Sequence, residues 1–276
     1  MRSNIAQGWK SLKNQFYVVI ILFLYHLLFG YFLYRLVNSA VVPLLQRYPD
    51  PPPTELSQIL FYIEGQLDLA HSSTVHNYLW ILLGMLLFRM LITPFIHSGI
   101  FYGLHQERKG EMGAFFFQGM RRCWKPVMLC YWIETLFVLA PAYWLLPKLY
   151  TIAMNGFMSP STLIQAIPWI VGWFLYRYVI HQIILYMQFG ITDDESLFSS
   201  TWICLRHVLS VIGISLILGA LSLLLFCLFT GLSLFWTGIL ALILQQAYPL
   251  ITCLFKMWNI TSQFNVWATK LSKNKK

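Results

Sequence analysis

The chain has 276 residues, of which 58% are hydrophobic and only 11% are charged, and its mean hydropathy is +0.63. Soluble globular domains carry about 25% charged residues, so this composition excludes an ordinary soluble protein and indicates one embedded in lipid. The formal charge of +9 does not indicate nucleic-acid binding, because the basic residues occur in short groups between long apolar runs.

Six apolar runs are long enough to cross a bilayer, whose hydrocarbon core of about 30 Å needs about 20 helical residues. Lipid offers no partner to exposed backbone groups, so we expect helices throughout and an all-α integral membrane bundle. The first run is too long for the core of a cleavable signal peptide, and we expect it to anchor the chain. In chain order, the predicted spans are 16–35, 78–103, 126–146, 168–190, 208–229 and 234–255.

The distribution of Lys and Arg predicts the orientation of these spans. With the N-terminus inside, fourteen of the 19 basic residues fall in inner segments and three in outer segments. Positive residues prefer the cytoplasmic side of a membrane. We therefore predict a multi-pass protein of the cell membrane with both termini in the cytoplasm.

The first outer loop is the longest, and its second half has helical periodicity over residues 54–69. Apolar residues recur there on one face: Leu56, Ile59, Leu60, Ile63 and Leu67. This pattern is typical of an amphipathic helix that lies on the outer surface or caps the bundle. Two roles stay open for it, a structural lid and a contact surface for a partner or substrate.

Two inner connections resemble each other. "FFQGMRRCWKPVM" (116–128) and "LFSSTWICLRHVL" (197–209) align at an offset of 81, which pairs Cys123 with Cys204. Upstream, "LLFRMLI" and "FLYRYVI" align Arg89 with Arg177. We interpret this as a tandem repeat of 78–146 and 168–229. The inner blocks are predicted to be short amphipathic elbow helices at the cytoplasmic interface, with basic residues toward the lipid headgroups: Arg121, Arg122, Lys125 and Arg206.

These motifs also resemble a known group of proteins. The order is an apolar span, then "SGIFYGLHQERKGE", then "FFFQGMRRCWK", then a further span, with the elbow repeated later. It resembles the membrane domain of bacterial glycerophosphoryl diester phosphodiesterases and the related YciC-like proteins, over about residues 85–230. In that group the phosphodiesterase activity belongs to a separate soluble domain that this chain does not contain. The resemblance therefore implies a stand-alone membrane module and assigns no catalytic residue.

The sequence contains no recognisable catalytic device. It has no G-x-S-x-G, H-E-x-x-H, P-loop or dinucleotide motif, and no span carries a pair of carboxylates. The five cysteines are odd in number and lack metal-binding spacing, so we expect free thiols. We predict a non-enzymatic protein that needs no cofactor and no metal.

Among the ionisable residues of the predicted spans we single out four: Arg89, Glu134, Arg177 and His181. A charge at the bilayer centre costs about 2.5–3.5 kcal/mol or more, so we expect these side chains to face the bundle interior and to pair. We expect Glu134 to neutralise Arg177, with Arg89 sharing it. Three interpretations stay open: a structural polar network, a site for an anionic lipid or small anion, and a proton or solute pathway.

The sequence thus favours a membrane module that binds lipid or a partner protein. We expect its partners to be anionic lipid headgroups at the cytoplasmic face and a membrane protein, not a nucleic acid. The alternative is a transporter or permease subunit for an anionic or small solute, which would use the intramembrane Arg/Glu cluster.

Overall fold

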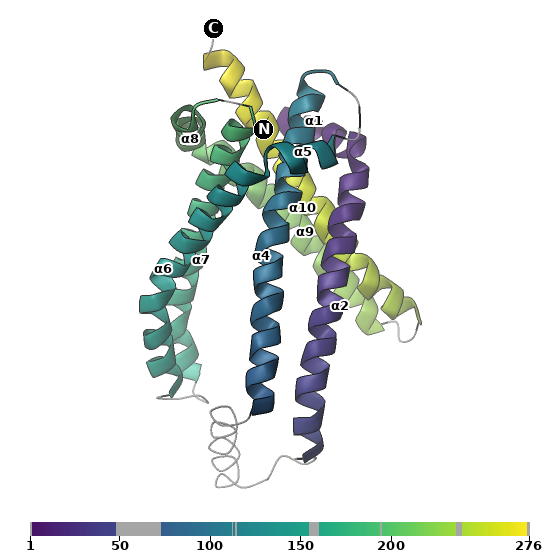
Figure 1. The fold of residues 1–276 in the computed structure, drawn as a ribbon, viewed down its shortest axis with the longest axis vertical. Coiled ribbons are helices and arrows are strands. Elements are labelled where there is room, and N and C mark those ends of the chain that lie inside the picture. Colours follow the sequence, from purple (N-terminus) through teal and green to yellow (C-terminus); the bar gives the residue numbers. More distant parts are fainter. Residues whose placement is uncertain are drawn as a thin grey trace. The chain divides into compact units, whose positions relative to one another are not determined.

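Helices account for every regular element in the part of the chain that the structure describes. The computed structural model describes residues 2–47, 73–111, 113, 115–154, 160–193, 195–235 and 239–274. The elements are α1 (Arg2–Asn14), α2 (Phe16–Arg47), α4 (Ser73–Arg108), α5 (Phe116–Arg122), α6 (Trp124–Met154), α7 (Pro160–Thr192), α8 (Leu197–Arg206), α9 (Val208–Phe235) and α10 (Ile239–Asn274) (Figure 1). The predicted all-α class is confirmed.

Five of these helices contain segments long and apolar enough to cross a membrane. The segments are Phe16–Ser39, His76–Arg108, Trp124–Thr151, Ile164–Thr192 and Val208–Leu232. They coincide with the first five predicted spans, so the chain is a multi-pass membrane protein. The sixth predicted span, 234–255, lies partly outside the described residues and stays a prediction. The predicted outer helix at 54–69 lies wholly outside them.

The second span is longer than its apolar run. It was expected to end at residue 103, but α4 continues to Arg108. Two residues beyond its end lies Gly110, whose φ of +86° is accessible to glycine at little cost. The Gly110 N–H bonds to the carbonyl of Glu107, and the Glu111 N–H bonds to that of Gln106. Such bonds close the last helical turn and stop the helix.

The chain divides into two compact units. Unit 1 comprises Met1–Val19 and Pro94–Lys276, and unit 2 comprises Ile20–Thr93. In unit 2, α2 and α4 run antiparallel and are tied by two hydrogen bonds. The Tyr25 and Thr93 hydroxyls lie 3.3 Å apart, and the Tyr78 hydroxyl donates to the Ser39 carbonyl at 3.1 Å.

The core of unit 1 is built around α10, which packs on α1, α7, α8 and α9. Its buried centre is aromatic. Phe189 lies 5.3 Å from Phe101 and 5.4 Å from Phe264, measured between ring centroids, and Trp267 is fully buried beside them. Edge-to-face rings of this kind add to the apolar burial that holds the helices together.

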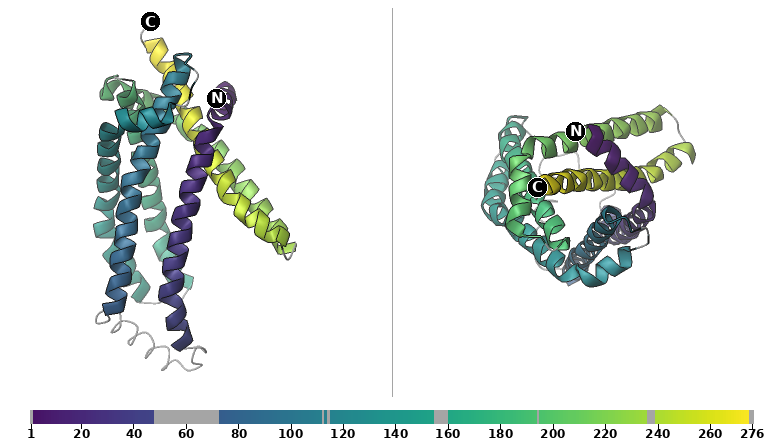
Figure 2. Two further views of the ribbon diagram at one scale, coloured as in Figure 1. Left: turned by 45° about the vertical axis from the view of Figure 1, so that its right-hand side comes forward. Right: turned by 90° about the horizontal axis from the view of Figure 1, so that it is seen from above.

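The first helix of unit 1 docks on the last. α1 crosses α10 (Figure 2), where the Trp258 indole donates to the Ile5 carbonyl at 3.0 Å and the Thr261 hydroxyl donates to the Gly8 carbonyl at 3.0 Å. A Cβ added at Gly8 would lie 2.8 Å from the Ser262 Cα, so only glycine permits this close approach.

Two short helices precede long ones at sharp breaks. α5 has 7 residues and is followed by a break at Cys123, where φ is −108° and ψ is 5°. α8 has 10 residues and is followed by a break at His207, where φ is −116° and ψ is 26°. The two breaks therefore share one backbone conformation. After α8 the break falls at His207 and not at Cys204, the residue that the predicted repeat pairs with Cys123.

Candidate functional site

The structure brings together two of the four predicted intramembrane residues. His181 Nδ1 on α7 lies 2.8 Å from Glu134 Oε1 on α6. The Glu134 side chain is 18% exposed and the His181 side chain is 46% exposed. The pair is thus a half-buried hydrogen bond on two neighbouring helices.

The sequence predicted that Glu134 pairs with Arg177, whereas in the structure Glu134 contacts His181. The Tyr176 hydroxyl donates to the Phe137 carbonyl at 3.0 Å, which sets the register of α7 against α6. In this antiparallel register Arg177 is level with Phe137, about one helical turn, or roughly 5 Å, from Glu134. Arg177 is exposed, and among the described residues it forms no ion pair within 4 Å.

Arg89 belongs to unit 2, where an aromatic ring contacts it. Its guanidinium carbon lies 4.9 Å from the centroid of the Phe29 ring, within the range of a cation–π interaction. The Thr93 hydroxyl donates to its carbonyl at 2.7 Å. The predicted sharing of Glu134 with Arg89 stays a prediction.

The predicted basic residues of the elbows lie on and beside the short helices. Arg121 and Arg122 form the last turn of α5, Lys125 lies in the first turn of α6, and Arg206 ends α8. The Arg122 guanidinium lies 6.0 Å from the Tyr102 ring, and the Lys125 ammonium 5.8 Å from the Trp124 ring. Two of these four cations thus lie beside an aromatic ring.

Arg121 lines a cleft of about 490 Å³ where α4, α5 and α6 meet. Its other lining residues are Phe95, Phe117, Met120 and Trp124. Phe95 and Trp124 stack with centroids 5.1 Å apart and planes inclined by 12°. The Phe117 side chain is 65% exposed. The cleft therefore combines an apolar, aromatic floor with one guanidinium, and we name it the elbow cleft.

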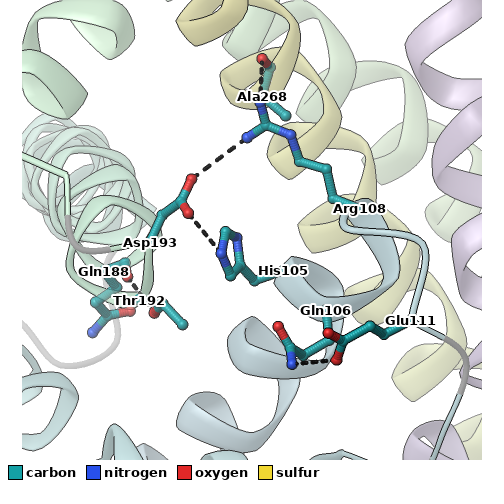
Figure 3. Close-up of polar contacts among 8 residues, drawn as sticks. All are labelled: His105, Gln106, Arg108, Glu111, Gln188, Thr192, Asp193 and Ala268. Carbon is teal, nitrogen blue, oxygen red and sulfur yellow. Dashed lines mark hydrogen bonds and ion pairs between the residues drawn. The ribbon is translucent and has the colours of Figure 1, made fainter.

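A second polar cluster joins three helices of unit 1 (Figure 3). His105 Nε2 in the last turn of α4 lies 2.6 Å from Asp193 Oδ1, just after α7. Arg108 Nη1 lies 3.6 Å from the other Asp193 oxygen, and Arg108 Nη2 donates to the Ala268 carbonyl of α10 at 3.5 Å. The side chains of His105 and Asp193 are 7% and 16% exposed. One carboxylate thus links α4 to α7, and Arg108 extends the link to α10.

The sequence did not reveal this cluster. Arg108 counted only as one of the fourteen basic residues of the inner segments. The signal that could have found it is the i, i+3 spacing of His105 and Arg108, which places both on one helix face. His105 Nδ1 is buried and has no hydrogen-bond partner among the described residues.

A third polar contact fixes the end of α1. Asn14 and Gln15 donate from their side-chain amides to the two oxygens of Glu107, at 2.8 and 2.9 Å. The last turn of α4 therefore carries residues that bind both α1 and the end of α7.

Two groups in and just after α8, Cys204 and His207, have shifted pKa values. Burial raises the pKa of the Cys204 thiol to about 11, so the thiol stays protonated and is a poor nucleophile. Burial lowers the pKa of His207 below its usual value, and the cations Lys270 and Arg206 act in the same direction. His207 therefore stays neutral at neutral pH, and Arg206 is the cation of α8.

No group of three or more His, Cys, Asp or Glu side chains among the described residues is placed to hold a metal ion. The chain matches no protein-family model, no curated protein and no solved structure.

Proposed function

We propose that this protein is a membrane module of the bacterial cell membrane that binds anionic phospholipid at the elbow cleft. The observation that carries the proposal is the composition of this cleft, in which Arg121 stands beside the aromatic floor of Phe95, Phe117 and Trp124. An arginine can grip a phosphate with two parallel hydrogen bonds, and the aromatic side chains suit the boundary between headgroup and acyl chain.

The proposal includes the topology and the role. The chain spans the membrane six times, both termini face the cytoplasm, and α5 and α8 are elbow helices at the cytoplasmic interface. The role is binding and not catalysis, and the expected kinship is with the YciC-like membrane modules. The basic residues around the cleft support this placement, because anionic lipids attract such residues at the cytoplasmic surface.

The test compares two cations in the last turns of the two short helices. The protein is extracted into lipid nanodiscs that contain phosphatidylglycerol and phosphatidylcholine, and native mass spectrometry counts the retained lipids. We expect Arg121→Gln to weaken retention of phosphatidylglycerol about tenfold, because a charge-assisted hydrogen bond contributes roughly 1.5–3 kcal/mol. Arg206→Gln is the matched control, since Arg206 does not line the elbow cleft. Equal retention by the two variants would contradict the proposal.

One observation favours a second candidate, a proton-coupled transporter. The Glu134–His181 pair joins two groups that can exchange a proton within a spanning segment. Proteoliposomes loaded with a pH-sensitive dye test this directly. A transporter predicts a proton flux that Glu134→Gln abolishes and that Thr135→Val leaves intact. Absence of flux above that of protein-free vesicles would remove this candidate.

A further inference from the structure

Unit 2 contains an apolar groove that the proposed function does not use. The groove has a volume of about 500 Å³ and lies between α2 and α4. Its lining includes Tyr25, Phe29, Phe32 and Arg35 from α2, and Met85 and Phe88 from α4. The Tyr25–Thr93 and Tyr78–Ser39 hydrogen bonds tie the two helices at either end, so the groove is held open between two fixed points.

The groove has one charged end. Of the described residues that line it, Arg35 alone is charged. Over the described residues of unit 2 (20–47 and 73–93) the sequence contains no Asp or Glu. The Arg35 guanidinium therefore has no carboxylate within the described part of its own unit to neutralise it. A groove with apolar walls and a cation at its edge suits a ligand that has an apolar part and an anionic group.

The apolar part of the groove matches one leaflet of a bilayer in length. It lies between Tyr25 and Arg35, which are about 15 Å apart along α2, roughly half of a hydrocarbon core of about 30 Å, and the lining continues past the cation to Ser39. From Phe16 to Arg35 the helix advances about 28 Å, so Arg35 reaches the membrane face opposite to the start of α2. The apolar part of the groove then runs from that face to mid-depth.

We propose that this groove binds one acyl chain of an anionic phospholipid, whose phosphate pairs with Arg35. The occupant belongs to the leaflet opposite to the start of α2. The inference is independent of the proposed function, because it rests on different residues in a different unit.

The groove is tested with the full-length protein in nanodiscs that contain phosphatidylglycerol and phosphatidylcholine. Met85→Trp fills the groove, and its matched control is Leu83→Trp, at an exposed position of α4 outside the lining. Arg35→Gln removes the cation, and its control is Lys148→Gln, a cation already held 3.4 Å from the Trp144 ring. Native mass spectrometry counts the bound lipids in each.

We expect both test variants to weaken binding of one phosphatidylglycerol about tenfold, whereas the controls keep it. The same loss must occur in the Arg121→Gln background, which separates this site from the elbow cleft. The inference is overturned if Met85→Trp retains the lipid. It is also overturned if phosphatidylcholine binds equally well, or if a second copy of the chain occupies the groove and appears as a lipid-free dimer.

A photoactivatable phosphatidylglycerol keeps the test decisive should a variant fail to fold. Its acyl-chain probe should cross-link the wild-type protein at Phe32 or Phe88, and excess phosphatidylglycerol should suppress the cross-link. Cross-links confined to peptides outside α2 and α4 would overturn the inference.

Discussion

At the scale of single residues, Asp193 contacts two basic side chains of α4 at once. Its two oxygens face a buried imidazole and a half-exposed guanidinium from the same helix. Because His105 Nδ1 has no partner in the described part of the chain, the ring depends there on the contact of its Nε2 with Asp193. Removing the carboxylate would leave the imidazole buried without any.

We therefore predict that Asp193→Ala lowers the free energy of unfolding by about 1–3 kcal/mol, the cost of leaving a buried polar group without its hydrogen bond. Glu111→Ala is the control, because Glu111 is exposed and accepts one hydrogen bond from the neighbouring Gln106. Its expected cost is below about 1 kcal/mol. Thermal unfolding in detergent measures both changes. Equal melting temperatures for the two variants would show that the cluster contributes little to stability.

At the scale of elements, each short helix contacts the long helix before it through a small residue. For α5 and α4, a Cβ added at Gly119 of α5 would lie 2.5 Å from Tyr102 Cβ and 3.0 Å from the Ser98 carbonyl oxygen of α4. For α8 and α7 the glycine is on the long helix, where a Cβ at Gly190 would lie 2.9 Å from Ser200 Cβ. The close approach is thus kept while the glycine changes sides. This likeness supports the tandem repeat, which stays a prediction.

The close approach at Gly119 predicts that a single added methyl group lowers the stability of the protein. Gly119→Ala should destabilise the protein by about 1–3 kcal/mol, because the methyl group meets backbone and Cβ atoms that cannot rotate away. Gly219→Ala on α9 should be neutral or stabilising by up to about 1 kcal/mol, because nothing lies within 4 Å of the added atom and alanine favours a helix. Unfolding in denaturant compares the two. A neutral Gly119→Ala would mean that α5 moves freely on α4.

At the scale of the whole molecule, the sequence predicted the helices far better than their contacts. Five spans could be predicted because each apolar run carries its own signal. The extension of α4 to Arg108 was missed because helical hydrogen bonds continue beyond the apolar run. The Glu134–His181 pair required the register of α7 on α6, and the His105–Asp193 pair required the fold of unit 1. The hydropathy of one segment predicts neither the register of two helices nor their packing.

The number of spans has a consequence that can be measured at the two ends of the chain. Six spans put both termini on one side, whereas five put them on opposite sides. We predict that epitope tags at both ends are protected in intact cells and become accessible only after permeabilisation. A C-terminal tag that is labelled in intact cells, beside a protected N-terminal tag, would show that the first half of α10 does not cross the membrane.

The docking of α1 on α10 also sets the order of events during biosynthesis. Ile5 and Trp258 are 253 residues apart, so at ordinary rates of translation the docking site emerges roughly 10 to 50 s after α1. Throughout that interval α10 is not yet there to cover the face of α1 that holds Gly8. An amphipathic helix in this situation rests on the membrane surface. A nascent chain that stops before α10 would leave α1 there, exposed to membrane proteases.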